Sequence, residues 1–208
     1  MVTRRRFILT GGAFTSVILA GCMTDNQMTT ELDSNGESQQ LSSPNQGKGD
    51  IFVEVFTDYS CNSCNVFQQT VYKYLKDNYI DGDEITYVHK DFPIPIDDWS
   101  VPTANAARKI QYEVGNEGFW EFKSEVNNPD FSPSVDTFRS LANEYNVPED
   151  ELLDSMKTGY FNPTLSVDYE YGREIEIPGT PAVLVDGDLI DYPMDSDMIS
   201  KVIEQKIS

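Results

Sequence analysis

Basic residues are scarce in this chain. Its 208 residues include 15 lysines and arginines against 35 aspartates and glutamates, which gives a formal net charge of −20. A nucleic-acid-binding surface needs clustered basic side chains to neutralise phosphates, so this composition excludes nucleic acid as a partner. A strongly acidic exterior keeps a protein soluble where salt screens weaker charge, and it predicts a halophile-type surface.

Nitrogen and sulfur ligands for metal ions are also few. The chain has one histidine and three cysteines, and it has no second C-x-x-C motif. A structural zinc site takes about four such ligands. We therefore expect no structural zinc and no bound cofactor.

Long apolar runs are limited to the N-terminus. Residues 8–20 form an apolar run that is too short for a confident membrane span and that follows Arg4, Arg5 and Arg6. The paired arginines resemble a twin-arginine export signal, and "LAGC", ending at Cys22, resembles a lipobox. We expect residues 1–22 to be a signal, with lipid on Cys22 anchoring the protein to the outside of the cell membrane.

Large apolar side chains are nearly absent from residues 23–49. Such a segment cannot bury enough surface to offset the entropy lost on ordering, so the sequence predicts a flexible tether. The folded domain is expected to cover residues 50–208.

The domain begins with a predicted β-α-β unit. Residues 51–57, "IFVEVFT", are mostly apolar, β-branched or aromatic, and they predict a strand. Apolar residues at helical spacing follow the two cysteines, and residues 84–92 predict a second strand. This order indicates a parallel strand pair with a crossover helix.

The second half of the domain has a different pattern. From about residue 99 to about 176 the periodicity is helical. After Pro178, two short apolar runs flank Asp186-Gly187, which predicts a β-hairpin. Asp195 is placed to cap a final helix. The predicted fold class is α/β, with a helical insertion between β-α-β and β-β-α halves.

Cys61 and Cys64 lie between the first strand and its helix. A helix N-terminus offers unpaired N–H groups and a positive dipole end, both of which favour a thiolate. The spacing lets Cys64 turn back toward Cys61 within one turn. A C-x-x-C motif alone nevertheless fits a redox couple, half of a metal site or a static disulfide.

The whole arrangement resembles the thioredoxin fold, and the insertion resembles the DsbA-like branch of thiol-disulfide oxidoreductases. Three segments carry the resemblance: "FTDYSCNSC", "YVHKDFPI" and "IPGTPAVLVDG". With the signal and the acidic composition, the chain resembles a haloarchaeal-type exported lipoprotein of this group.

The resemblance implies roles for individual residues. Cys61 would be the attacking thiol and Cys64 its buried partner. Thr180 and Pro181, the latter in the cis form, would lie opposite them and bind the client backbone. The implied partners are proteins with thiols or disulfides and an unidentified redox partner.

Two features depart from the family pattern. Relatives often carry a buried acid six residues before the first cysteine, which moves protons to and from the second thiol. Here that position is Val55, and strand alternation points the neighbouring Glu54 to the opposite face. Asn62 and Ser63 replace the proline or histidine that many relatives have between the cysteines.

Two other functions remain open at this point. Two thiolates and one imidazole suit a copper ion, so Cys61, Cys64 and His89 could instead serve a thioredoxin-like copper chaperone. A binding module with a static Cys61–Cys64 disulfide is the other alternative, although such a short loop is usually reducible.

Overall fold

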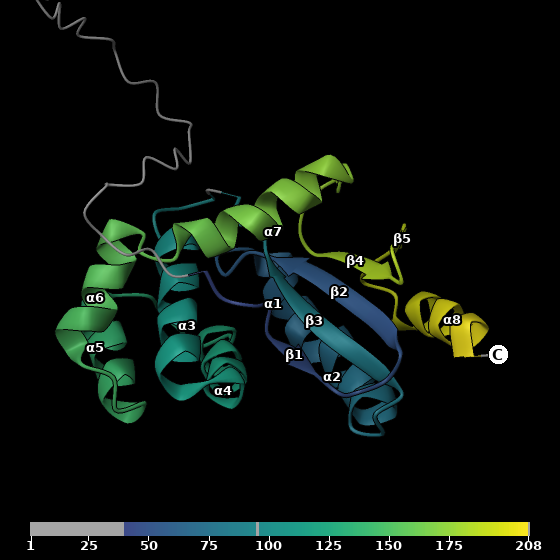
Figure 1. Ribbon diagram of the computed structural model, residues 1–208, viewed down its shortest axis with the longest axis horizontal. Helices are drawn as coiled ribbons and strands as arrows, with labels where there is room; N and C mark the ends of the chain where they lie inside the picture. Colours follow the sequence, from purple (N-terminus) through teal and green to yellow (C-terminus); the bar gives the residue numbers. More distant parts are fainter. Residues whose placement is uncertain (1–39, 95, 208) are drawn as a thin grey trace, which may run out of the picture.

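A five-stranded sheet forms the centre of the computed structural model, which describes residues 40–94 and 96–207. The strands run in the order β1-β3-β2-β4-β5 (Figure 1). Their bounds are β1 Asn45–Gln46, β2 Ile51–Thr57, β3 Ile85–Asp91, β4 Ala182–Val185 and β5 Asp188–Leu189.

The strand predictions are confirmed. β2 pairs in parallel with β3, with Ile51 opposite Ile85 and Thr57 opposite Asp91. β4 joins β2 antiparallel, and β5 follows it after the turn at Asp186-Gly187. β2 and β3 therefore end side by side at the same edge of the sheet, and the cysteines follow the end of β2.

The structure corrects the predicted start of the domain. Residues 45–46, which we placed in the flexible tether, form β1 and pair antiparallel with β3. The backbone N–H of Leu41 donates to Thr164 Oγ1 (3.0 Å). Polar residues can form strand and loop contacts through their backbone alone, which composition does not reveal. Residues 1–39, including the predicted signal and Cys22, lie outside the described part of the chain.

Helices cover both faces of the sheet. A continuous helical stretch follows the cysteines, and the final helix packs on the same face. Asp195 Oδ1 accepts the N–H groups of Asp197 and Met198, so the predicted cap is confirmed. The bounds on this face are α1 Asn62–Phe67, π-helical segments Gln68–Tyr72 and Lys76–Ile80, α2 Lys73–Leu75 and α8 Ser196–Ile207.

The predicted helical insertion forms a bundle beside the sheet. Its first four helices gather at one side, and the fifth crosses to the other face of the sheet (Figure 1). Their bounds are α3 Ser100–Val114, α4 Asn116–Val126, α5 Val135–Glu144, α6 Glu149–Thr158 and α7 Asn162–Glu174. No helix in residues 40–94 and 96–207 has the length and apolarity of a membrane span.

Alternation along β2 divides the apolar side chains between two cores. Val53 and Val55 are fully buried in the large core with the α1 stretch and the insertion. Phe56 belongs to a smaller core beneath α7, where Tyr171 packs against it. Glu54 lies on this second face too, because it occupies the same strand parity as Phe56.

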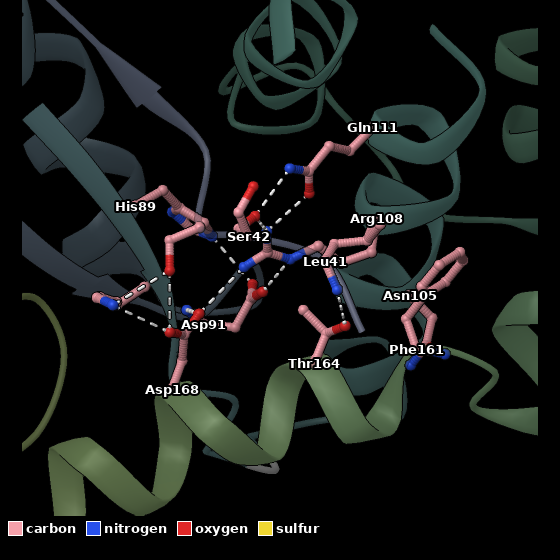
Figure 2. A network of polar contacts seen from close by, with 12 residues as sticks. Leu41, Ser42, His89, Asp91, Asn105, Arg108, Gln111, Phe161, Thr164 and Asp168 are labelled. Carbon is pink, nitrogen blue, oxygen red and sulfur yellow. Dashed lines mark hydrogen bonds and ion pairs between the residues drawn. The ribbon is translucent and has the colours of Figure 1, made fainter. Parts of the chain in front are cut away.

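A fully buried arginine joins the insertion to the sheet. Arg108 of α3 donates through Nε to Asp91 Oδ2 (2.6 Å) and through Nη2 to Asp168 Oδ2 of α7 (3.0 Å). Its Nη1 also donates to the backbone oxygen of Ser42 (3.3 Å) and to Gln111 Oε1 (2.7 Å), as Figure 2 shows. One guanidinium therefore holds β3, α3, α7 and the N-terminal segment together.

We expect the replacement of Arg108 by methionine to cost about 3–5 kcal/mol of unfolding free energy, because two buried carboxylates lose their cation. Denaturant unfolding measures this loss. Arg139, which pairs with Asp136 at the surface, is the matched control, and its replacement by methionine should cost less than about 1 kcal/mol. Equal losses in the two variants would contradict a structural role for the buried cluster.

Candidate active site

The two cysteines lie where β2 gives way to the α1 stretch. Cys61 is the N-cap residue of α1, and its Sγ accepts the backbone N–H of Cys64 (3.3 Å). Both are free thiols, with 6% of Cys61 and 3% of Cys64 exposed. The helix start therefore directs N–H groups at Cys61 and leaves Cys64 deeper in the core.

This geometry separates the acidities of the two thiols. Hydrogen bonding from the Cys64 side chain lowers the pKa of Cys61 to about 5, with further help from Thr180 and from the backbone N–H groups of Cys64 and Ser63. Burial and the neighbouring Cys61 sulfur raise the pKa of Cys64 far above its usual range. At neutral pH one sulfur is a thiolate and the other a thiol.

Thr180 and Pro181 face the dithiol across the site. The Thr180–Pro181 peptide bond is cis, which confirms that prediction. The sulfur of Cys61 lies 3.4 Å from the backbone oxygen of Thr180.

Asn62 and Ser63 complete the loop between the cysteines. Both side chains are exposed, and the contribution of Ser63 to Cys61 comes from its backbone. Tyr59 and Ser60, just before the motif, are adjacent to Cys61 in sequence and are therefore candidates for contacts at the rim of the site. Tyr59 is instead buried, whereas Ser60 is partly exposed and donates to Asp97 Oδ1 (2.6 Å).

Asp58 is a buried carboxyl beside the motif. Its Oδ1 accepts the backbone N–H of Ser60 (2.7 Å), and its Oδ2 has no partner among the described residues. Burial raises the pKa of Asp58 to about 6. Its negative charge above that pH opposes thiolate formation at Cys61, so the low pKa of that thiol is reached in spite of Asp58.

The acid expected six residues before Cys61 is absent from the site. Val55 occupies that position and is fully buried. No bulge turns Glu54 toward the cysteines, because β2 stays in register with both neighbours. Glu54 instead lies 3.4 Å from Lys90 and accepts from the Tyr171 hydroxyl (3.3 Å) on the α7 face.

Sequence reasoning missed a lysine beneath the dithiol. Lys123 of α4 is 2% exposed, and its ammonium lies 4.9 Å from the centre of the Tyr59 ring. Burial lowers the pKa of Lys123 to about 8, and Cys64 is its strongest electrostatic partner. No sequence pattern marks this position, because a lysine on a helix is ordinarily exposed and only the tertiary fold buries this one.

His89, the third residue of the copper alternative, is held by the protein itself. Its Nε2 lies 2.9 Å from Asp91 Oδ1 and its Nδ1 3.4 Å from Thr57 Oγ1. Burial and the charge of Lys123 lower the pKa of His89 to about 3, so the ring is neutral. Copper ligation would break one of these hydrogen bonds. Within the described residues no three His, Cys, Asp or Glu side chains are grouped to hold a metal ion.

A low-pKa thiol and a buried thiol at a helix start, opposite a cis-proline, define a thiol-disulfide oxidoreductase. The family model described as "Thioredoxin" matches residues 47–205. The chain belongs to the thioredoxin family, as its sequence motifs indicated.

Similar proteins agree with this class. A protein of Bacillus cereus named "Probable disulfide bond formation protein D" is 23% identical over 201 residues, which cover 92% of this chain and 91% of that protein. "Disulfide bond formation protein D" of Bacillus subtilis is 22% identical over 181 residues, covering 83% and 81%.

Two solved structures share the fold over most of their length. Oxidised BdbD from Bacillus subtilis superposes with a TM-score of 0.71 at 23% identity, covering 82% of this chain and 97% of that one. DsbA from Chlamydia trachomatis gives a TM-score of 0.68 at 22% identity, covering 79% and 91%. The predicted DsbA-like thioredoxin fold is therefore confirmed.

We expect Cys61 of the reduced chain to react with iodoacetamide at a rate that reaches half its maximum near pH 5, because only the thiolate is nucleophilic. Cys64 should stay unreactive across the neutral range because its pKa is high. Mass spectrometry of peptides assigns the label to each cysteine. Half-maximal labelling of Cys61 at pH 8 or above, where a free cysteine titrates, would contradict the site geometry.

Proposed function

We propose that the chain is a disulfide donor that oxidises thiols of client proteins outside the cytoplasm. Cys61 is the sulfur that clients attack, and Cys64 is the leaving group that is released within the protein. Asn62 and Ser63 form the exposed loop beside them. Thr180 and Pro181 provide the surface against which an extended client backbone lies.

The observation that carries the direction of exchange is the lowered pKa of Cys61. A stabilised thiolate favours the reduced form of the dithiol, so the disulfide form is correspondingly oxidising. The acidity arises from hydrogen bonds that Cys61 receives at the helix start, which the disulfide form loses. The names of the Bacillus relatives, which describe disulfide bond formation, support the same direction.

The oxidised full chain should convert a synthetic peptide with two cysteines into its disulfide form, with one peptide disulfide formed per chain. Mass spectrometry follows the peptide. Cys61→Ser removes the attacked sulfur and should abolish the reaction. Cys64→Ser cannot form the Cys61–Cys64 disulfide, so it has no oxidising equivalent to give and should also leave the peptide reduced. Equal peptide oxidation by wild type and Cys61→Ser would remove the basis of the proposed function.

We also propose that the chain reaches its site of action through residues 1–22 and is held at the membrane by lipid on Cys22. The arginines, the apolar run and the small residues before Cys22 support this, and they occur in the order that such signals require. Residues 23–39 would then separate the domain from the lipid surface.

Expression in the native type of host should yield a chain that begins at Cys22 and carries a mass increase for lipid. Cys22→Ser should remain soluble or unprocessed, because no thiol is left to modify. Intact-mass measurement of the membrane and soluble fractions checks both outcomes. A membrane-bound wild type that retains residues 1–21 and an unmodified Cys22 would show that the segment is an uncleaved anchor.

A further inference from the structure

Lys123 is a buried cation without an anionic partner in the described structure. Its Nζ donates to Thr57 Oγ1 and to Asn127 Oδ1, both at 3.3 Å, and it forms no ion pair with a described carboxylate. A buried lysine without a counter-ion is costly to the fold. The neighbouring lysine of the insertion, Lys109, pairs instead with Glu113 and Glu151.

The hydrogen bonds of Lys123 suit both of its protonation states. A neutral amine has two N–H groups, and the described residues offer two oxygen acceptors, on Thr57 and Asn127. The nitrogen also lies 4.9 Å from the centre of the Tyr59 ring, whose face attracts the positive charge of the ammonium. The site therefore holds the amine when neutral and tolerates it when charged.

Several contacts place Lys123 beneath the dithiol. Thr57 ends β2, four residues before Cys61, and Asn127 Nδ2 donates to Asn65 Oδ1 (2.7 Å), next to Cys64. The charge of Lys123 interacts with Cys64 more strongly than with any other titratable group. Cys64 carries its own proton in the dithiol form and has none to accept.

The other charged and titratable groups around Lys123 leave its proton free to move. Asp91 lies on the same side of the sheet, but it is bound to Arg108 (2.6 Å) and to His89 (2.9 Å). Arg108 offsets the attraction of Asp91 for the ammonium. His89 is neutral, and the buried Tyr59 hydroxyl keeps its proton because burial raises its pKa.

We propose that Lys123 is the group that gives a proton to Cys64 when the disulfide opens and takes it back when the disulfide closes. This inference rests on the proposed dithiol function and assigns the role that the acid absent from position 55 would fill. Lys123 comes from α4 of the insertion, so the helical insertion supplies part of the chemistry of the thioredoxin half.

The steps balance as follows. A client thiolate attacks Sγ of Cys61, the Cys61–Cys64 bond breaks, and its electron pair goes to Sγ of Cys64. The ammonium of Lys123 gives that sulfur a proton and becomes a neutral amine. A second client thiolate then attacks the client sulfur, Cys61 leaves as a thiolate, and the client has lost two electrons.

Reoxidation by a disulfide of the redox partner reverses the proton transfer. The thiolate of Cys61 attacks that disulfide and releases one partner thiolate. The neutral amine of Lys123 takes the proton from Cys64, whose thiolate attacks Sγ of Cys61. The second partner thiolate leaves, so the partner gains two electrons and the Cys61–Cys64 bond forms again.

Two nearby carboxyls are the competing proton carriers. Glu54 is excluded by its position on the α7 face, where it contacts Lys90 and Tyr171. Asp58 has an unpartnered oxygen in the site, but its pKa of about 6 leaves it ionised at neutral pH, without a proton to give. The variant Asp58→Asn is therefore compared directly with Lys123→Met.

The test is the reduction of the oxidised full chain by dithiothreitol between pH 5 and pH 10. Acid quenching, alkylation and mass spectrometry count the opened Cys61–Cys64 bonds, and each rate is divided by the concentration of dithiothreitol thiolate. In the wild type this normalised rate should fall as the pH rises toward 8, because Lys123 loses its proton. Its pKa of about 8 in the dithiol form includes a raising contribution from Cys64, which the disulfide form lacks. Lys123→Met should be about 10-fold slower or more at pH 7 and should show no such fall.

Controls separate proton transfer from a structural effect. Lys109→Met removes a lysine of the same insertion and should keep the wild-type profile. Lys123→Met should melt at or above the wild-type temperature, since it removes a desolvated charge. Asp58→Asn should keep the same fall as the wild type.

Two outcomes overturn the proposal. A wild-type profile retained in Lys123→Met excludes this lysine, and a fall near pH 6 that disappears in Asp58→Asn assigns the proton to Asp58. The wild type could instead show the expected pH profile, and Lys123→Met could lose it, while the oxidised wild-type chain fails to oxidise the dithiol peptide. That result would reject the proposed function alone.

Discussion

The buried guanidinium of Arg108 is the contact on which the arrangement of the site depends. Removing a cation and two carboxylates from water is costly, and the cost is offset only while Asp91 and Asp168 both stay within hydrogen-bond distance. This requirement fixes α3 and α7 against the end of β3. Although burial opposes its charge, Arg108 and His89 hold the pKa of Asp91 well below its usual range. An ionised Asp91 can only accept, so neutral His89 presents its Nε2–H to it (Figure 2). The Nδ1 of His89 then faces the hydroxyl of Thr57.

The polar contacts then continue from the insertion to the dithiol. Thr57 lies between His89 and Lys123, with its hydroxyl within 3.4 Å of both nitrogens. The backbone N–H groups of Ser63 and Cys64, at the start of α1, favour the thiolate of Cys61, whereas burial is the largest influence on Cys64. The two sulfurs are close in sequence, yet one meets hydrogen-bond donors and the other a low-dielectric core. The separation of their pKa values follows from that difference in surroundings.

The sequence predicted the elements whose stability is local or periodic. β2 and β3 are apolar runs, Asp186-Gly187 has the residues of a tight turn, and Asp195 has the side chain of a helix cap. It failed where stability comes from distant partners. β1 consists of polar residues that pair through their backbone, and Lys123 is buried only because α4 packs against the cysteine loop. The dithiol was visible because its two residues form one short motif, whereas Lys123 comes from a distant segment of the chain.

The sign of the charge beneath Cys64 affects the direction of exchange. An ionised carboxylate at position 55 would oppose the negative charge that develops on Cys64 as the disulfide opens. An ammonium at Lys123 stabilises that charge, which favours opening by a client thiolate. The effect acts in the same direction as the low pKa of Cys61, since both stabilise the reduced form. Because Lys123 is buried, salt that screens the acidic exterior leaves its interaction with Cys64 largely unchanged. A core lysine therefore allows the redox site to work independently of a surface carrying many carboxylates.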